Sequence, residues 1–540
     1  MTEPLDVHSL RPLAAVAVSG VATLLIMLSW RWPTIREGWT IAAAVGKFGL
    51  VLSMVPDALA GHYHVTHVGT LVPGIEFTLR ADPLGLLFGT VASGLYVATA
   101  LYSIGYLRDA TPHEATRFFA ALAASLSATM GVAFATNLLT LFLFYELLTV
   151  ATYPLVVHDE TTAARAAGYK YLAYALSGGV AVVLGTLIVF LLAGSVSFDP
   201  GGIPALATAA SADPWFARLA FAVLVAGFGV KAAVMPLHSW LPSAMVAPTP
   251  VSGLLHAVAV VKSGVFAIAR TVLEVFGPET VAELGVGIPL AVAAGATILL
   301  GSLLALCQDN LKARLAYSTI AQLSYIVLGI ALLAPAAMVG ALVHLPAHAF
   351  AKLTLFFCAG ALHVEVGVDD VSEVAGVGRR MPLTMAAFAV ASLSMAGIPL
   401  LAGFVSKWYL LAGGAAATGA VVPLVLVVSG LLNVAYFWPI VYAAFFETRA
   451  DADAKPVLEG PFGGGTDVRA DGGDGDGRPS DGTDGWDRRD WRGAETTAYL
   501  LVPILATTAL VVLVGLAAGE LFFLEAARRT VEAATGVTLP

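Results

Sequence analysis

The sequence predicts an all-α polytopic membrane protein, and two observations carry this prediction. Of the 540 residues, 58% are hydrophobic and only 12% are charged, and the mean hydropathy is +0.84. A soluble protein with so few charged residues could not cover that much apolar surface, whereas a lipid bilayer covers it. Apolar runs of about 20 residues, long enough for a helix to cross the hydrocarbon core, also recur along the whole chain.

The apolar runs predict about fourteen membrane helices. They are expected near residues 12–30, 38–56, 83–107, 115–135, 137–157, 166–194, 216–237, 250–274, 286–307, 313–334, 336–362, 382–412, 418–446 and 497–523. The first run lacks a small-residue cleavage site before "WRWPTIRE", so we expect it to be an anchor and not a removed signal peptide.

A β-hairpin on the outer side is expected near 60–81, between the second and third helices. Apolar and polar residues partly alternate in "HYHVTHVGTLVPGIEFTLR", and "VPG" can turn. His62, His64 and His67 could bind a metal, but without carboxylate or cysteine companions the exposed face of a strand is the favoured interpretation.

The segment 447–496 differs from the rest of the chain. It is rich in Gly and Asp, and residues 451–495 hold twelve acids and six bases. This composition predicts a disordered, solvated loop. A calcium loop in "DGGDGDGRPSDG" is disfavoured, because Gly482 stands where the EF-hand needs a bidentate Glu.

The loops that follow odd-numbered helices hold more Lys and Arg than the loops on the other side. The positive-inside rule therefore predicts a cytoplasmic 447–496 loop, with both chain termini outside. The two cysteines, Cys307 and Cys358, lie in apolar helices, and no CxxC, CxxCH or Cys/His cluster occurs. The sequence thus predicts no cofactor and no metal site, and any redox chemistry must reside in another chain.

Five lysines fall within apolar segments, namely Lys47, Lys231, Lys262, Lys352 and Lys407. A lysine at the centre of a membrane helix costs about 2.5–3.5 kcal/mol, so such residues are expected to have a function. Lys47 is the exception, because we expect it to lie near a helix end and to extend its amine to the membrane surface.

Glu146, in "LFLFYELLTV", is the most isolated acid within the apolar helices. We expect it to pair with a lysine from another helix. Burial favours the neutral form of a lysine, whereas a nearby carboxylate favours the charged form. A lysine held between these effects can bind a proton and release it when the carboxylate moves away.

Two lysines stand in matching frames, "GFGVK" at 227–231 and "GFVSK" at 403–407. Pro236 follows the first frame and Pro399 precedes the second, so a helix break is expected beside each lysine. Interrupted helices in corresponding halves of a chain indicate an ion site in a transporter. The frames therefore indicate an internal duplication.

Histidines accompany these lysines. In "HLPAHAFAK", His344, His348 and Lys352 are spaced to lie along one helix face. A polar file of this kind predicts a proton relay, the alternative for each histidine being a hydrogen-bonded core residue. His256 and Lys262 are six residues apart and are expected to face different neighbours.

Several segments resemble the antiporter-like subunits of respiratory complex I, membrane-bound hydrogenases and Mrp-type Na⁺/H⁺ antiporters. They are "KAAVMPLHSWLPSAMVAPTPVSGLLHAVAVVKSGVFAIAR", "LKARLAYSTIAQLSY", "HAFAKLTLFFCAGALH" and "SMAGIPLLAGFVSKW". The resemblance implies fourteen core helices and two inverted five-helix repeats, with helices 7 and 12 broken. The implied divisions are 1–114 for helices 1–3, 115–275 for the first repeat, 286–446 for the second, and 497–540 for helix 14 and a tail.

The resemblance also implies which residues transfer protons. They are Glu146, Lys231, Lys262, Lys352 and Lys407, with His256 and His348 at polar positions on the connecting axis, and His344 joins them on the spacing above.

Among the branches, "KAAVMPLHSWLP" and "GFVSKWYLL" look most like the Mrp D subunit. The implied function is a proton-translocating subunit of a multi-subunit Na⁺/H⁺ antiporter in the cell membrane. Its expected partners are the other subunits, protons, Na⁺ and the lipid bilayer, without nucleic acid. Two alternatives stay open: a proton-pumping subunit of a complex I-like oxidoreductase or hydrogenase, and a structural membrane subunit without transport of its own.

Overall fold

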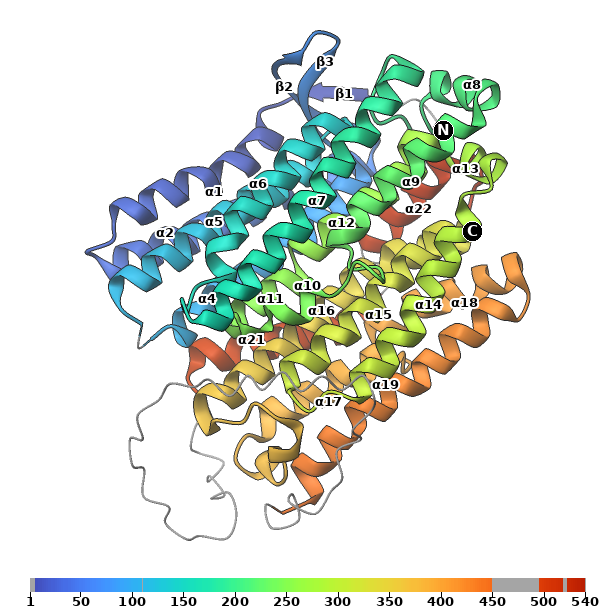
Figure 1. Ribbon diagram of the computed structural model, residues 1–540. Helices are drawn as coiled ribbons and strands as arrows, with labels where there is room; N and C mark the ends of the chain where they lie inside the picture. Colours follow the sequence, from blue (N-terminus) through green and yellow to red (C-terminus); the bar gives the residue numbers. More distant parts are fainter. Residues whose placement is uncertain (1–4, 109, 449–494, 518–521, 540) are drawn as a thin grey trace.

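The computed structural model describes residues 5–108, 110–448, 495–517 and 522–539. Most of them lie in helices that run along one another in a bundle, with a small sheet at one end (Figure 1). Among the described residues, twelve helices are long and apolar enough to cross a membrane. The chain is therefore an all-α multi-pass membrane protein, as predicted. The predicted acidic loop lies almost entirely outside the described residues.

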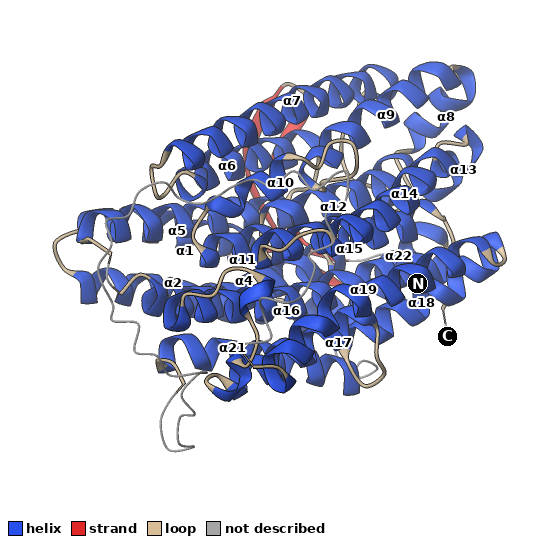
Figure 2. Ribbon diagram, turned by 60° about the horizontal axis from the view of Figure 1, so that its bottom comes forward, coloured by secondary structure: helices blue, strands red, loops and turns tan. Residues whose placement is uncertain are grey.

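The N-terminal part combines helices with a three-stranded sheet, the one sheet visible in Figure 2. Its elements are β1 (Leu5–His8), α1 (Arg11–Leu28), α2 (Pro33–Leu52), α3 (Val55–Leu59), β2 (His62–Val72), β3 (Ile75–Ala81) and α4 (Pro83–Tyr106). β2 and β3 form the predicted antiparallel hairpin. β1 pairs in parallel with β2 and was not predicted, because four residues are too few to show an alternation.

The following helices are α5 (Pro112–Phe134), α6 (Leu138–Val156), α7 (Thr162–Ala193) and α8 (Pro204–Ala212). Side-chain caps fix the starts of the three long ones, since Thr111, Asn137 and Thr161 each accept a hydrogen bond from the backbone N–H three residues later. α7 ends at Gly194, whose φ of 67° is a conformation that glycine adopts without a steric penalty.

The middle of the chain is repeatedly interrupted. Its elements are α9 (Pro214–Lys231), α10 (Trp240–Ser243), η1 (Ala244–Val246), α11 (Thr249–Ala257), α12 (Val260–Arg270) and the π-helical turn η2 (Thr271–Phe276). The predicted helix near 216–237 ends at Lys231, before Pro236, which agrees with the predicted break. The helix predicted near 250–274 is also divided, at Val258 and Ala259, and the apolar sequence there carries no Gly or Pro to signal the interruption.

The remaining elements are α13 (Pro278–Leu284), α14 (Gly287–Leu306), α15 (Leu311–Ala331), α16 (Pro335–Val366), η3 (Val371–Glu373), η4 (Val377–Arg379), α17 (Pro382–Ala396), α18 (Ala402–Thr418), α19 (Val421–Phe446), α21 (Ala498–Leu516) and α22 (Phe522–Thr535). The long helix α16 packs against helices from both ends of the chain, including α4, α11, α18 and α21. Its residues 337–362 are all buried.

Two of the predicted spans are not among the twelve. The run near 313–334 forms α15, which contains Lys312, Arg314 and Gln322, and the run near 382–412 is divided into α17 and α18 by residues 397–401. The number of fourteen spans and the inverted repeats therefore stay predictions. The segment predicted as a C-terminal tail instead contains α22, an amphipathic helix that packs on α4 and α16.

Candidate proton path

Lys231 is the last residue of α9, and only 1% of its surface is exposed. Its Nζ donates a hydrogen bond to the carbonyl oxygen of Tyr145 on α6 and lies 3.3 Å from the centroid of the Tyr145 ring. A carbonyl oxygen and an aromatic face both stabilise an ammonium group. After Lys231 the chain leaves the helix, and the Trp240 indole N–H closes the turn by donating to the Val230 carbonyl at 2.8 Å.

Glu146 does not form the predicted ion pair with Lys231, since the described residues include no direct contact between the two charged groups. Its carboxylate faces α7, where a Cβ added to Gly179 would lie 2.6 Å from Glu146 Oε1. Neighbouring residues of a helix project about 100° apart, so Tyr145 reaches Lys231 while Glu146 reaches α7.

The first glycine of each GF-x-x-K frame touches a neighbouring backbone. A Cβ added to Gly227 would lie 2.7 Å from the Gly178 carbonyl oxygen on α7, and one added to Gly403 would lie 1.9 Å from the Ser394 carbonyl oxygen on α17. The lysine stands four residues later on the same helix face. In both frames, therefore, two helices approach each other closely at the glycine, one helical turn before the lysine.

Two hydrogen-bonded pairs, Lys262 with His348 and His344 with Ser406, lie one after the other across three helices. Lys262 Nζ on α12 lies 2.8 Å from His348 Nδ1 on α16. The ring centroids of His348 and His344 are 6.0 Å apart, and His344 Nδ1 lies 2.9 Å from Ser406 Oγ on α18. The Tyr325 ring links this series to the second frame, because its centroid lies 5.5 Å from that of His344 and 5.0 Å from Lys407 Nζ.

The Nε2 atoms of His344 and His348 are buried, with no hydrogen-bond partner within the described part of the chain. Buried polar atoms of this kind usually bind an ordered water, and one lying between the two rings would connect them. Lys407, at the end of the series, donates to the Met395 carbonyl and lies 5.0 Å from the centroid of the Tyr325 ring.

Lys352 lies one turn beyond His348 on α16 but is directed to α15. Its Nζ donates to the Leu315 carbonyl at 3.0 Å and to Ser318 Oγ. The predicted single file of His344, His348 and Lys352 is therefore only partly formed. His348 Nδ1 contacts Lys262 on α12, and Lys352 contacts α15.

A polar network between α14, α15 and α19 was not predicted. The Gln322 amide donates to Asn433 Oδ1 at 3.1 Å, the Tyr436 hydroxyl donates to the same atom, and the hydroxyls of Ser302 and Ser429 lie 2.9 Å apart. The sequence did hold a signal, since Ser429, Asn433 and Tyr436 follow the spacing of one face of a helix. Lys352 and this network both contact α15.

His256 lies in the last turn of α11, and its ring centroid lies 4.8 Å from that of Phe356 on α16. Neither ring nitrogen has a hydrogen-bond partner among the residues described. As predicted, His256 and Lys262 face different neighbours, because Lys262 contacts His348 instead.

Lys47 does not extend to the membrane surface, so that prediction is wrong. The side chain is fully buried, its Nζ lies 4.9 Å from the centroid of the Tyr96 ring on α4, and it has no hydrogen-bond partner in the described ranges. α2 continues to Leu52 and packs against α4, which encloses the amine.

A buried charged cluster at the other end of α12 was also missed. Arg270 Nη2 lies 2.8 Å from Asp82 Oδ1, and Arg270 Nη1 lies 2.5 Å from Glu274 Oε2. Burial acts to raise the pKa of Asp82, but the guanidinium groups of Arg270 and Arg80 outweigh burial and lower it. Asp82 and Arg270 are far apart in sequence, so no spacing could link them, and their contact ties the start of α4 to α12.

The hairpin histidines make protein contacts. His64 Nε2 lies 2.8 Å from Asp57 Oδ2, and His67 Nδ1 lies 3.2 Å from Thr78 Oγ1. His64 is buried, so the interpretation as an exposed strand face holds for His62 and His67 but not for His64.

The protein is a polytopic membrane protein whose helix bundle contains buried lysines and histidines that contact one another between helices. More particularly, the chain belongs to the NADH:quinone oxidoreductase/Mrp antiporter transmembrane family, whose model matches residues 135–433. The family agrees with the resemblance seen in the sequence.

Three relatives illustrate the breadth of this family. The chain is 34% identical over 425 residues to the A/B subunit of a probable K⁺/H⁺ antiporter of Rhizobium meliloti, and 31% identical over 410 residues to the A1 subunit of a Na⁺/H⁺ antiporter of Staphylococcus aureus. These matches cover 77% and 73% of the chain but only 41% and 50% of those two proteins. The N subunit of the NADH-quinone oxidoreductase of Desulforudis audaxviator is 34% identical over 457 residues, covering 83% of the chain and 88% of that protein.

Solved structures share the fold. A chain of the Mrp complex from Dietzia sp. superposes with a TM-score of 0.79 at 24% identity, covering 97% of both chains. A chain of an archaeal membrane-bound sulfane sulfur reductase superposes with a TM-score of 0.78 at 18% identity, and the match covers 97% of this chain and 100% of the reductase chain.

Proposed function

We propose that this chain is a proton-translocating, D-type subunit of a multi-subunit monovalent cation/proton antiporter in the cell membrane. The observation that carries the proposal is the arrangement of two hydrogen-bonded pairs, Lys262 with His348 and His344 with Ser406, whose histidine rings lie 6.0 Å apart. Ionisable groups are costly inside a membrane bundle, and they persist where protons or ions pass. The names of the two antiporter relatives support the same function.

In this proposal Lys231 is the switch and Glu146 its regulator. Lys231 rests on the carbonyl and ring of Tyr145, and Glu146 acts on it from the adjacent position of α6. A movement of the Glu146 carboxylate toward Lys231 favours the ammonium form, and its withdrawal toward Gly179 favours release of the proton. The proton then moves toward Lys262, the histidines and Lys407.

Lys407 is the proposed exit toward one membrane face. Its side chain is 7% exposed, whereas Lys262 and Lys352 are fully enclosed. Lys352 and His256 complete the set of proposed proton-transfer residues, and the network around Asn433 offers Lys352 a second set of polar neighbours.

The other subunits of the antiporter are the proposed partners, and the cation is proposed to be Na⁺. The relatives named above come from both a K⁺/H⁺ and a Na⁺/H⁺ antiporter, so both cations need to be compared. Both chain termini are proposed to lie outside, with the 447–496 segment in the cytoplasm, on the distribution of Lys and Arg.

A redox-driven proton pump is the second candidate function. It is favoured by the match to the N subunit of the oxidoreductase, which covers 88% of that protein. The conduction path would be the same and the driving partner would differ. A structural protein of the complex, without transport of its own, is the candidate of a different class.

Membrane vesicles from antiporter-deficient cells test these candidates. The chain is produced with and without its neighbouring subunits, and dissipation of a pH gradient is recorded after addition of Na⁺ or K⁺. The antiporter proposal predicts cation-driven dissipation with the full set of subunits. A complex that lacks this response but acidifies vesicles when given a reductant and a quinone would support the pump instead.

A further inference from the structure

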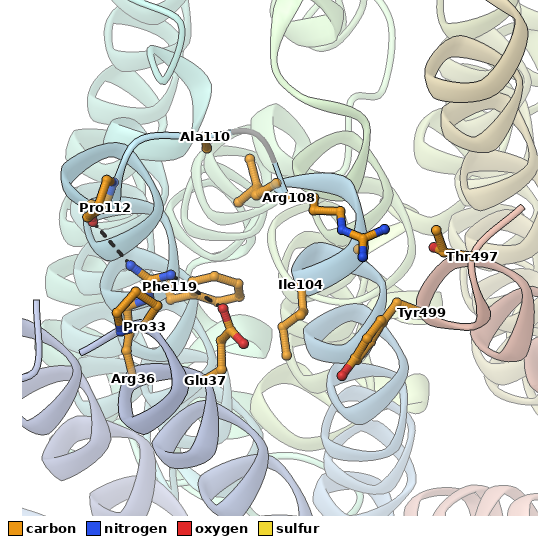
Figure 3. Close-up of a pocket in the computed structure, with 12 residues that line it drawn as sticks. Pro33, Arg36, Glu37, Ile104, Arg108, Ala110, Pro112, Phe119, Thr497 and Tyr499 are labelled. Carbon is orange, nitrogen blue, oxygen red and sulfur yellow. Dashed lines mark hydrogen bonds and ion pairs between the residues drawn. The ribbon is translucent and has the colours of Figure 1, made fainter. Parts of the chain in front are cut away.

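A charged cavity has a volume of about 300 Å³, and none of its described lining residues belongs to the proposed proton path. Figure 3 shows the side chains that line it. It is enclosed by the starts of α2, α5 and α21 and by the end of α4. Arg36 and Arg108 lie on opposite sides of it, with Ile104 between them.

Among the described residues that line the cavity, two are arginines and one is a glutamate. Arg36 is 4% exposed and donates to the Pro112 carbonyl at 3.1 Å and to Thr116 Oγ1 at 3.2 Å. Its guanidinium also lies 3.5 Å from Glu37 Oε1, the carboxylate that lines the cavity, while Arg36 Nε has no partner among the described residues.

Arg108 provides the second positive charge. Its side chain is exposed, and none of the described hydrogen bonds or ion pairs engages it. The described lining residues thus provide two guanidinium groups and one carboxylate, a balance that favours an anion with several acceptor oxygens, such as a phosphate group.

An apolar groove continues from this cavity. It has a volume of about 200 Å³, is lined by Leu101, Ala498, Val502 and Pro503, and shares Tyr499 with the charged cavity. Leu101 precedes Arg108 by about two turns of α4 and Val502 lies one turn into α21, so the groove leads away from the charged end and along the membrane helices.

Tryptophans mark the same end of the molecule as a membrane interface. Trp30 and Trp32, between α1 and α2, are 47% and 59% exposed, and the Arg31 guanidinium lies 4.7 Å from the centroid of the Trp30 ring. Tryptophan and arginine gather where headgroups meet the hydrocarbon region.

We propose that this cavity and groove bind one anionic phospholipid, with its phosphate between Arg36 and Arg108 and an acyl chain in the groove beside Tyr499. The site goes beyond the transport function and does not depend on it. A free phosphate ion would use the arginines alone, whereas a lipid needs the arginines and the groove together.

Native mass spectrometry of the purified full-length protein tests the proposal, after delipidation and exposure to dioleoylphosphatidylglycerol, dioleoylphosphatidylcholine or inorganic phosphate. The wild type is expected to retain one phosphatidylglycerol in preference to phosphatidylcholine. Arg108→Gln should weaken that retention by up to about fivefold, since one charge-assisted contact of an exposed arginine is lost. Arg165→Gln, an exposed arginine at the start of α7, is the matched control and should retain the lipid as the wild type does.

Ala498→Trp fills the groove from an exposed position and leaves both arginines in place. It should abolish phosphatidylglycerol retention. The proposal would be overturned if the wild type retained both lipids equally or if Arg108→Gln left retention unchanged. It would also be overturned if the wild type bound no lipid and Ala498→Trp still bound inorganic phosphate, since the site would then bind a free ion. Loss of the lipid on assembly with the neighbouring subunits would also overturn it, because a protein would then be the occupant.

Discussion

Lys262 Nζ lies 2.8 Å from His348 Nδ1, although the residues belong to different helices and are 86 positions apart. When Lys262 is charged it can only donate, so His348 then accepts through Nδ1 and carries its proton on Nε2. That Nε2 has no other partner in the described residues. In the proposed relay, this contact places a proton donor beside an acceptor that can release a proton from its Nε2.

Replacement of His348 by alanine is expected to slow proton transfer by about 100-fold, the lower range for loss of a positioned acid–base group. The rate is measured as cation-driven dissipation of a pH gradient in vesicles. His363→Ala provides the control, because His363 is an exposed histidine near the end of the same helix. Equal rates for His348→Ala and the wild type would rule out the relay through α16.

Gly179→Ala is expected to impair transport without unfolding the protein. The added Cβ would lie 2.6 Å from Glu146 Oε1, and the carboxylate is the mobile end of a side chain, so it moves while the helices stay in place. Gly295→Ala on α14 is the control, because its Cβ meets nothing within 4 Å. Normal transport by Gly179→Ala would mean that the position of Glu146 against α7 is unimportant.

Gly403→Ala is expected to lower the melting temperature of the detergent-purified protein. Its Cβ would lie 1.9 Å from the Ser394 carbonyl oxygen, a backbone atom that can retreat only if α17 and α18 separate. Overpacking of this kind costs roughly 1–3 kcal/mol. Gly430→Ala, whose nearest atom is 3.6 Å away, should leave the melting temperature unchanged. The same melting temperature for both variants would refute the account of the frame glycines.

Lys47→Met is expected to raise the melting temperature and to leave transport unchanged. The amine is fully buried beside Tyr96 with no carboxylate or carbonyl contact in the described residues, so an apolar side chain of similar length removes an unpaired charge. Lys262→Met, by contrast, should stop transport. Loss of transport in Lys47→Met would place Lys47 on the proton path.

The sequence was informative where a residue conflicted with its surroundings. Glu146 and the four lysines were recognisable because a charge inside an apolar run is costly, and all four lysines are buried in the structure. The helix breaks beside Lys231 and Lys407 were recognisable because Pro and Gly mark them.

The pairing of these residues was less accessible from the sequence. Helical spacing linked His344 and His348 but could not show that Lys262 of α12 reaches His348 while Lys352 turns to α15. Pairing depends on how helices are rotated about their axes. Tyr145 faces Lys231, whereas Glu146, the next residue of α6, projects about 100° away from that direction. The division of 249–276 into α11 and α12 also left no trace, because Val258 and Ala259 are as apolar as their neighbours.

The most direct measurement compares Lys231→Ala with the wild type in vesicles that contain the full set of subunits, with recovery of each one measured in parallel to confirm assembly. The account predicts that Na⁺ or K⁺ dissipates the pH gradient in wild-type vesicles and that this response is lost in Lys231→Ala, with Glu146→Gln strongly reduced. An assembled Lys231→Ala complex that dissipates the gradient at the wild-type rate would contradict it.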